Sequence, residues 1–117
     1  MKRGEVWTIA GGADYTGKPR PAVVVQDESF DMGNSVTICG LTSVLTETTV
    51  VADTVLRPEV EPSETNGLKV RSQVMTDKVT TIPRSKLGAH IGELAEQDIL
   101  NLDQALLVFL GLARRTG

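Results

Sequence analysis

The chain has few of the side chains that most often act as nucleophiles or metal ligands. It contains one cysteine, Cys39, and one histidine, His90. A single cysteine cannot form an internal disulfide, which suits a reducing compartment. The two residues could form a catalytic pair, but nothing around Cys39 predicts an exposed thiolate, and SVTICGLTS favours a small residue on a buried strand. We interpret His90 as an exposed or half-buried strand residue.

Sequence features that define several large protein classes are also absent. No hydrophobic run is long enough for a transmembrane helix, and Glu5 interrupts the apolar residues behind the basic start, so we expect a cytoplasmic protein without a signal peptide. No P-loop, GxSxG or CxxC motif occurs. Asp27, Glu28 and Asp31 could hold a hard cation, but acids at a turn are more often solvated. We therefore predict no metal and no cofactor.

The charge of the chain is low overall but unevenly distributed. The net charge is −3, which argues against a non-specific nucleic-acid binder. Residues 26–66 carry eight acidic residues and one arginine, whereas residues 67–88 carry five basic residues and one aspartate. Residues 1–25 add four basic residues against two acids. The first and third segments could build a basic face, although charges that only solvate strand surfaces would give the same pattern.

The alternation of short β-branched stretches and turn residues predicts a mainly β (α+β) fold, a small β-barrel with a C-terminal amphipathic helix. At 117 residues we expect one domain, over 1–117. From Ala95 onward, Ile99, Leu102, Leu106 and Phe109 or Leu110 form one helical stripe, and Gly111 is the expected C-cap. Strands are expected at 5–10, 22–26, 35–41, 46–56, 68–75 and 89–94.

The stretch LKVRSQVM, residues 68–75, shows the clearest two-residue alternation. We expect one of its faces to be mildly apolar and the other to be polar and exposed. The apolar face would carry Leu68, Val70, Ser72 and Val74, and the polar face Lys69, Arg71 and Gln73.

The segment KPRPAVVV places Arg20 between Pro19 and Pro21. The fixed φ of each proline restricts the backbone on both sides, so the arginine is held more rigidly than on an ordinary loop. The apolar run that follows predicts a strand that is buried on both faces or nearly so. Arg20 therefore stands at the mouth of a buried strand, as either a structural anchor or a functional group.

Arg20 and Thr42 are predicted to meet at one rim of the barrel. If strands 22–26 and 35–41 are antiparallel neighbours joined by the turn DMGN, the start of the first lies beside the end of the second. A guanidinium and a hydroxyl so placed, with Lys18 nearby, can recognise and polarise a phosphodiester. The alternative is equally open: Arg20 pairs with an acid, and Thr42 only ends a strand.

Five stretches carry a resemblance to a known family. They are RGEVWTI, KPRPAVVVQ, ICGLTS, SQVMTDKVTTIPRSKLGAHIGEL and DQALLVFLGL. In this order they resemble the MazF/PemK-type toxins, which are endoribonucleases of type II toxin–antitoxin pairs. The resemblance implies an SH3-like barrel of the CcdB/PemK type, a homodimer, a cognate antitoxin as partner, and metal-independent cleavage of single-stranded RNA, especially mRNA.

The resemblance also assigns roles to individual residues. Arg20, in the arginine–proline motif, and Thr42, at the end of the third strand, would be the catalytic pair. The loop before the motif and the segment 77–82 border the RNA groove in the family. The residues predicted to contact RNA are Lys18, Ser43, Tyr15 and Lys78.

Two departures from the family pattern fall in these bordering segments. The loop GGADYTGKP lacks the glutamate and glutamine that many members carry, and DKVTTI stands where many have EQIRTI. Both changes bear on base preference and leave the Arg20–Thr42 pair untouched. The alternatives are a non-catalytic barrel that poisons DNA gyrase, as the CcdB branch does, and an idle RNA-binding module. The gyrase branch depends on a C-terminal tip that ARRTG does not resemble.

Overall fold

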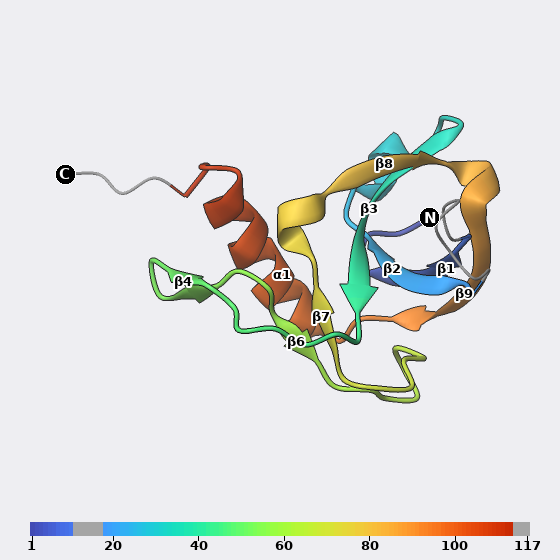
Figure 1. Ribbon diagram of the computed structural model, residues 1–117. Helices are drawn as coiled ribbons and strands as arrows, with labels where there is room; N and C mark the ends of the chain where they lie inside the picture. Colours follow the sequence, from blue (N-terminus) through green and yellow to red (C-terminus); the bar gives the residue numbers. More distant parts are fainter. Residues whose placement is uncertain (11–17, 114–117) are drawn as a thin grey trace.

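The computed structural model describes residues 1–10 and 18–113, and its main feature is a curled sheet with one helix along its side (Figure 1). The sheet runs in the order β6-β7-β3-β2-β1-β9, and β8 pairs with β3 off this path. This arrangement confirms the predicted mainly β barrel-like fold with a C-terminal helix. The strands of the sheet are β1 (Glu5–Ile9), β2 (Arg20–Val24), β3 (Ser35–Thr42), β6 (Glu59–Val60), β7 (Ser72–Val74), β8 (Thr80–Pro83) and β9 (Leu87–Glu93).

The centre of the sheet is formed by β2 and β3, which pair antiparallel from Ala22 opposite Gly40 to Val24 opposite Ile38. Their side chains alternate between two apolar clusters. Val23 belongs to one cluster, and Ala22 and Val24 belong to the other; all three are fully buried. The prediction that this apolar run is a strand buried on both faces is therefore confirmed, as is its antiparallel pairing with the next strand.

The middle of the chain differs from the prediction of one strand over 46–56. That segment holds a small separate hairpin, β4 (Val50–Val51) and β5 (Thr54–Val55), which is linked by Ala52 and Asp53. Both linking residues have positive φ, 50° and 60°. Two-residue hairpin turns with positive φ at both positions favour glycine, asparagine or aspartate, and of the two linking residues only Asp53 is one of these, so the local turn signal is weak.

The prediction for 68–75 is also only partly right. Only Ser72–Val74 is a strand, and Val70 is 54% exposed. Gln73, expected on the exposed face, is completely buried, because its amide group finds backbone and side-chain partners on Thr46. Its Nε2 donates to the Thr46 carbonyl at 2.7 Å. A buried amide with satisfied hydrogen bonds is not costly, which explains why the polarity pattern misplaced it.

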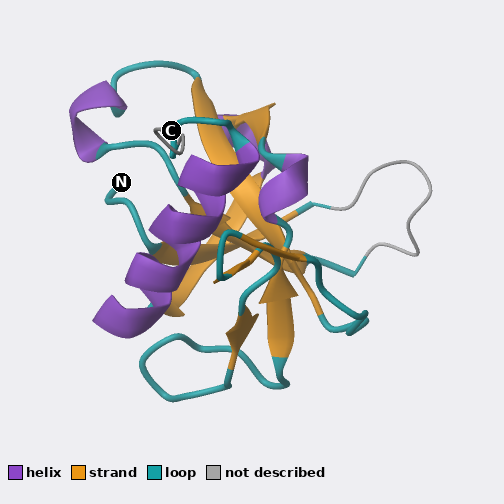
Figure 2. Ribbon diagram, turned by 90° about the vertical axis from the view of Figure 1, so that its left-hand side faces the viewer, coloured by secondary structure: helices purple, strands orange, loops and turns teal. Residues whose placement is uncertain are grey.

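The helix α1 (Glu96–Phe109) packs across one side of the sheet (Figure 2). Leu102 is fully buried, and Ile99 and Leu106 pack against the core, as the helical stripe predicted. The last part of the stripe is not covered: Phe109 and Leu110 are 44% and 55% exposed.

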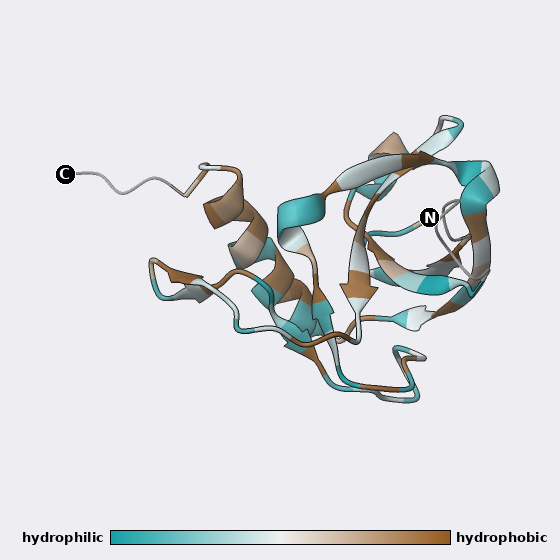
Figure 3. Cartoon of the chain, in the orientation of Figure 1, coloured by the Kyte–Doolittle hydropathy of each residue, from teal (hydrophilic) through white to brown (hydrophobic). Residues whose placement is uncertain are grey.

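The end of α1 and the hairpin β4–β5 both carry exposed hydrophobic residues, which appear brown in Figure 3. Gly111 follows the helix with φ +73° and donates its N–H to the Val108 carbonyl, the left-handed geometry that favours glycine there. In the described ranges, α1 and the short helical turns are neither long nor apolar enough to cross a membrane.

Candidate functional site

A groove of about 610 Å³ opens at the edge of the barrel where β2 begins and β3 ends. Its floor is largely apolar and includes Leu41, Leu68 and Ile91. Its rim carries three cations, Lys18, Arg20 and Lys69. None of the described residues that line it is acidic. An apolar floor with a cationic rim suits a ligand that has flat apolar groups on an anionic backbone.

Arg20 reaches this groove because it is the first residue of β2. On one side it pairs with Ile9 of β1, and the flanking Pro21 pairs with Thr8. On the other side, the β2–β3 pairing ends at Ala22 opposite Gly40, and extending it by two residues would bring Arg20 opposite Thr42. Arg20 thus begins β2 and Thr42 ends β3, its antiparallel neighbour, while Thr42 itself pairs with Gln73 of β7.

Thr42 itself is not part of the groove lining. It is only 8% exposed, and its Oγ1 accepts a hydrogen bond from the Val44 N–H at 3.1 Å. A hydroxyl that accepts one hydrogen bond keeps its own proton to donate. The exposed hydroxyl at the groove is that of the next residue, Ser43.

The other expected RNA contacts are distributed unevenly. Lys18 lines the groove beside Arg20. Tyr15 lies outside the described residues. Lys78 is at the end of the short helical turn Thr76–Lys78 and does not line the groove.

The residue before Lys78 shows what this turn does in the fold. Arg57 donates from Nε and Nη2 to the two carboxylate oxygens of Asp77 at 2.8 and 2.9 Å. The Arg57 hydrogen bonds hold the pKa of Asp77 below its usual value, and the same contacts raise the pKa of Arg57. The pair fixes the turn Thr76–Lys78 to the segment that precedes β6.

Lys69 is a groove residue that the sequence analysis did not single out. The alternation over 68–75 predicts it on the polar face of a strand, but it lies on the loop between β6 and β7 and lines the groove together with Gly67 and Val70. The excess of basic residues over 67–88 was the available signal, but it did not distinguish Lys69 from its neighbours.

Cys39 and His90 are not a catalytic pair in this structure. Cys39 is fully buried in an apolar cluster, and burial raises the pKa of its thiol to about 11. His90 lies on β9 and stacks on Trp7, with ring centroids 5.0 Å apart.

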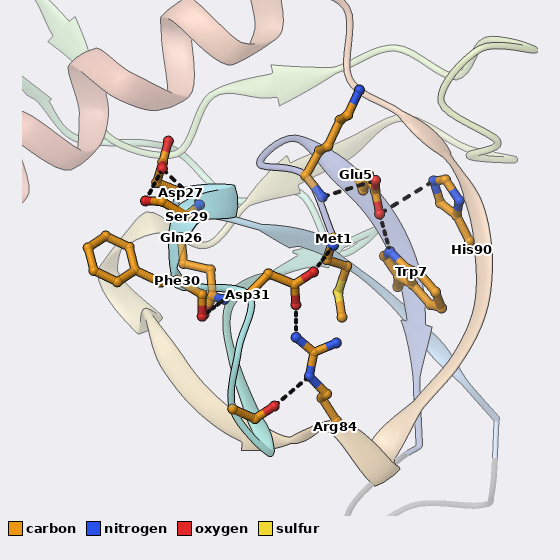
Figure 4. A network of polar contacts seen from close by, with 12 residues as sticks. Met1, Glu5, Trp7, Gln26, Asp27, Ser29, Phe30, Asp31, Arg84 and His90 are labelled. Carbon is orange, nitrogen blue, oxygen red and sulfur yellow. Dashed lines mark hydrogen bonds and ion pairs between the residues drawn. The ribbon is translucent and has the colours of Figure 1, made fainter.

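Three acidic side chains outside the groove, Glu5, Asp27 and Asp31, are engaged by protein partners (Figure 4). Asp31 pairs with the Met1 amine and the Arg84 guanidinium, and Asp27 caps the short turn Glu28–Phe30 through the Ser29 N–H. These contacts account for two of the three acids in DESFD.

Glu5, His90 and Glu93 form the group of described residues that offers three ligand atoms within 4.8 Å of one another. The oxygens of Glu5 already accept hydrogen bonds from the Trp7 indole and the Lys2 N–H. Burial raises the pKa of Glu5, but these hydrogen bonds outweigh that effect, and the pKa lies below its usual value.

The comparisons with known proteins agree with one another. Residues 2–110 match the family described as PemK-like, MazF-like toxin of type II toxin–antitoxin system. The chain is 46% identical over 113 residues to a probable endoribonuclease MazF of Mycolicibacterium smegmatis, covering 97% of this chain and 99% of that protein.

Solved structures with the same fold include toxins bound to their antitoxins. One is an endoribonuclease in complex with its cognate antitoxin from a mycobacterial species, with a TM-score of 0.75, 22% identity, and coverage of 98% of this chain and 99% of that one. Another is a MazE–MazF complex of Deinococcus radiodurans, with a TM-score of 0.70, 18% identity, and coverage of 95% of each chain. At these identities the likeness concerns the fold.

Proposed function

The chain belongs to the PemK-like, MazF-like toxin family of type II toxin–antitoxin systems, and on this basis we propose that it is an endoribonuclease that cleaves single-stranded RNA at the groove of Arg20. Its expected substrate is mRNA in the cytoplasm, and its expected partners are a second copy of the chain and a cognate antitoxin. Cleavage of mRNA would stop translation and growth, and the antitoxin would prevent this by covering the groove.

The observation that carries the proposal is the composition of the groove. Lys18, Arg20 and Lys69 stand around an apolar floor, and no acidic residue is among its described lining residues. Phosphates pair with the cations, and Arg20 can make a two-pronged contact with phosphate oxygens that a lysine cannot make. Bases can pack on the aliphatic floor. No second candidate function is favoured by this arrangement.

The proposed chemistry uses a nucleophile that RNA supplies itself, the 2′-OH. The 2′-OH loses its proton and its oxygen forms a bond to phosphorus, the bond from phosphorus to the 5′ oxygen breaks, and the leaving 5′ oxygen takes up one proton, so that protons and charge balance over the step. The products are a 2′,3′-cyclic phosphate and a 5′-hydroxyl. In this scheme Arg20 stabilises the negative charge of the pentavalent transition state. It is a poor base because its guanidinium stays protonated.

Thr42 and Ser43 supply hydroxyls at the end of β3, the strand that pairs with β2. In our proposal Thr42 donates its remaining proton to the same phosphate, and Ser43 contacts the RNA strand from the exposed position. The burial of Thr42 means that this donation needs a small opening of the rim when RNA is bound.

The test is a cleavage assay on a long single-stranded RNA in the presence of EDTA. We expect defined cuts, cyclic-phosphate ends and 5′-hydroxyl ends. A matched oligonucleotide with one deoxynucleotide on the 5′ side of the scissile phosphate should bind equally well but resist cleavage. Normal cleavage of that oligonucleotide would contradict the 2′-OH mechanism, and an intact RNA after long incubation would contradict the proposed activity.

A further inference from the structure

One wall of the groove is formed by part of the loop 61–71, which is held by hydrogen bonds to a buried side chain. Its anchor is Asn66, which is 2% exposed. The Asn66 Oδ1 accepts from the N–H groups of Ser63 and Leu68 at 3.0 and 2.9 Å, and its Nδ2 donates to the Glu61 carbonyl at 2.8 Å. One buried side chain thus ties three points of the loop together, which limits its motion.

The same loop is docked on β9 by two glycines. A Cβ added at Gly67 would lie 2.1 Å from the Ile91 carbonyl oxygen, and one added at Gly92 would lie 2.4 Å from the backbone of Asn66. Gly67 also has φ +71°, which favours glycine. The Glu93 N–H donates to the Thr65 carbonyl at 2.9 Å across this contact. Because glycine has no Cβ, the two backbones can approach each other this closely at Gly67 and Gly92. This contact positions the loop on β9.

This fixed loop carries two cations in different environments. Arg71 is neutralised by Glu61 and Glu59, with nitrogen–oxygen distances of 2.5 and 3.7 Å. Lys69 lines the groove and makes no ion pair with an acidic residue in the part of the chain that the structure describes. Lys69 is exposed, and its ammonium adds positive charge to a groove whose described lining residues include no acid.

We propose that Lys69 forms a second phosphate-binding subsite, which holds a phosphate flanking the scissile one on the same RNA strand. The inference rests on the proposed function and adds how the strand is oriented: one phosphate at Lys18 and Arg20, the other at Lys69, and the sugar and base between them over the apolar floor. Lys69 is a positioning residue, since it does not touch the reacting atoms.

The first experiment measures binding of the deoxy-substituted oligonucleotide, which does not require cleavage. Loss of one phosphate contact lowers the salt dependence of single-strand binding by about 0.7 in the log–log slope. Lys69→Ala should show this loss and bind about three- to tenfold more weakly at moderate salt. Arg71→Ala removes the same charge from the same loop and is the matched control; we expect it to leave the slope unchanged. Equal losses in both variants would overturn the proposal, because they would indicate that RNA binding responds to the net charge of the loop and not to a direct contact with Lys69.

The second experiment identifies the phosphate. Neutral methylphosphonate linkages are placed one at a time along the oligonucleotide. For the wild-type chain one flanking position should weaken binding, and that penalty should vanish in Lys69→Ala but persist in Arg71→Ala. A penalty that persists in Lys69→Ala would show that Lys69 contacts no single phosphate and would overturn the subsite.

The two proposals can fail separately. If the wild-type chain cleaves RNA and Lys69→Ala binds with an unchanged slope, only the subsite is wrong. If the wild-type chain binds through Lys69 but cleaves nothing under any tested condition, the nuclease assignment is wrong and the subsite stands.

Discussion

The middle of strands β2 and β3 and the ends of the same strands have opposite characters. In the middle, Val23 and Cys39 are fully buried and Ile38 is 2% exposed. Arg20, three residues before Val23 at the start of β2, and Ser43, directly after the end of β3, are exposed at the groove. The buried residues that stabilise the sheet and the residues proposed to act on RNA therefore lie on the same two strands, only a few residues apart. Substitutions in the two regions should therefore have separable effects, on unfolding in the middle and on cleavage at the ends.

The largest effect is expected at Arg20. Arg20→Ala should lower the cleavage rate by about 10²–10³-fold, because a preorganised donor to the transition-state charge is lost. Arg20→Lys should recover little, since an ammonium cannot reproduce the two-pronged contact. Circular dichroism and the thermal midpoint should stay close to wild type. Full activity in a folded Arg20→Ala variant would make Arg20 a structural anchor. The ends of the strands would then have no demonstrated role in cleavage that distinguishes them from the middle.

A smaller effect is expected at Thr42. Its hydroxyl accepts a hydrogen bond within the protein and, in our proposal, donates one to the RNA phosphate. Thr42→Ala should cut the rate by about 10- to 100-fold, the range for a hydrogen bond to a charged group. Thr42→Ser should keep more activity than Thr42→Val. Because Oγ1 also accepts from the Val44 N–H, Ala and Val should lower the free energy of unfolding by about 1 kcal/mol as well.

Ser43→Ala is the matched control for this series, as it removes the neighbouring exposed hydroxyl without touching that turn. Rates measured at saturating RNA separate the two hydroxyls. A larger loss in Ser43→Ala than in Thr42→Ala would move the donor role to Ser43.

The smallest effect is expected in the strand middle. Ile38→Val removes one methylene from a buried site and should lower the free energy of unfolding by about 0.5–1.5 kcal/mol. The folded variant should cleave RNA at the wild-type rate below its unfolding transition. Urea titration gives the first quantity and the cleavage assay at low temperature the second. A rate loss without a stability loss would mean that the middle of the sheet is coupled to the groove.

The parts of the fold that follow from local pattern were predictable. The β-branched run behind Pro21 predicted the central strand, the turn at residues 31–34 predicted its antiparallel neighbour, and the spacing of Ile99, Leu102 and Leu106 predicted the buried face of α1. The expected neighbourhood of Arg20 and Thr42 follows from extending the register of these two strands by two residues beyond Ala22 and Gly40.

The rest depended on contacts between distant segments. The hairpin β4–β5 turns at two residues with positive φ that carry no glycine, and Gln73 is buried because a segment 27 positions away meets its amide. Lys69 reaches the groove because its loop docks on β9 through glycine contacts. No window of the sequence contains both partners of such a contact.

The stacking of Trp7 on His90 has a spectroscopic consequence. Trp7 is the chain's single tryptophan, its indole N–H donates to Glu5 at 2.9 Å, and His90 stacks on it from the neighbouring strand β9. All tryptophan emission therefore comes from the seam between the first and last strands of the sheet. Since neither ring lines the groove, the emission should follow separation of that seam during unfolding while a labelled oligonucleotide reports occupancy of the groove in the same cuvette.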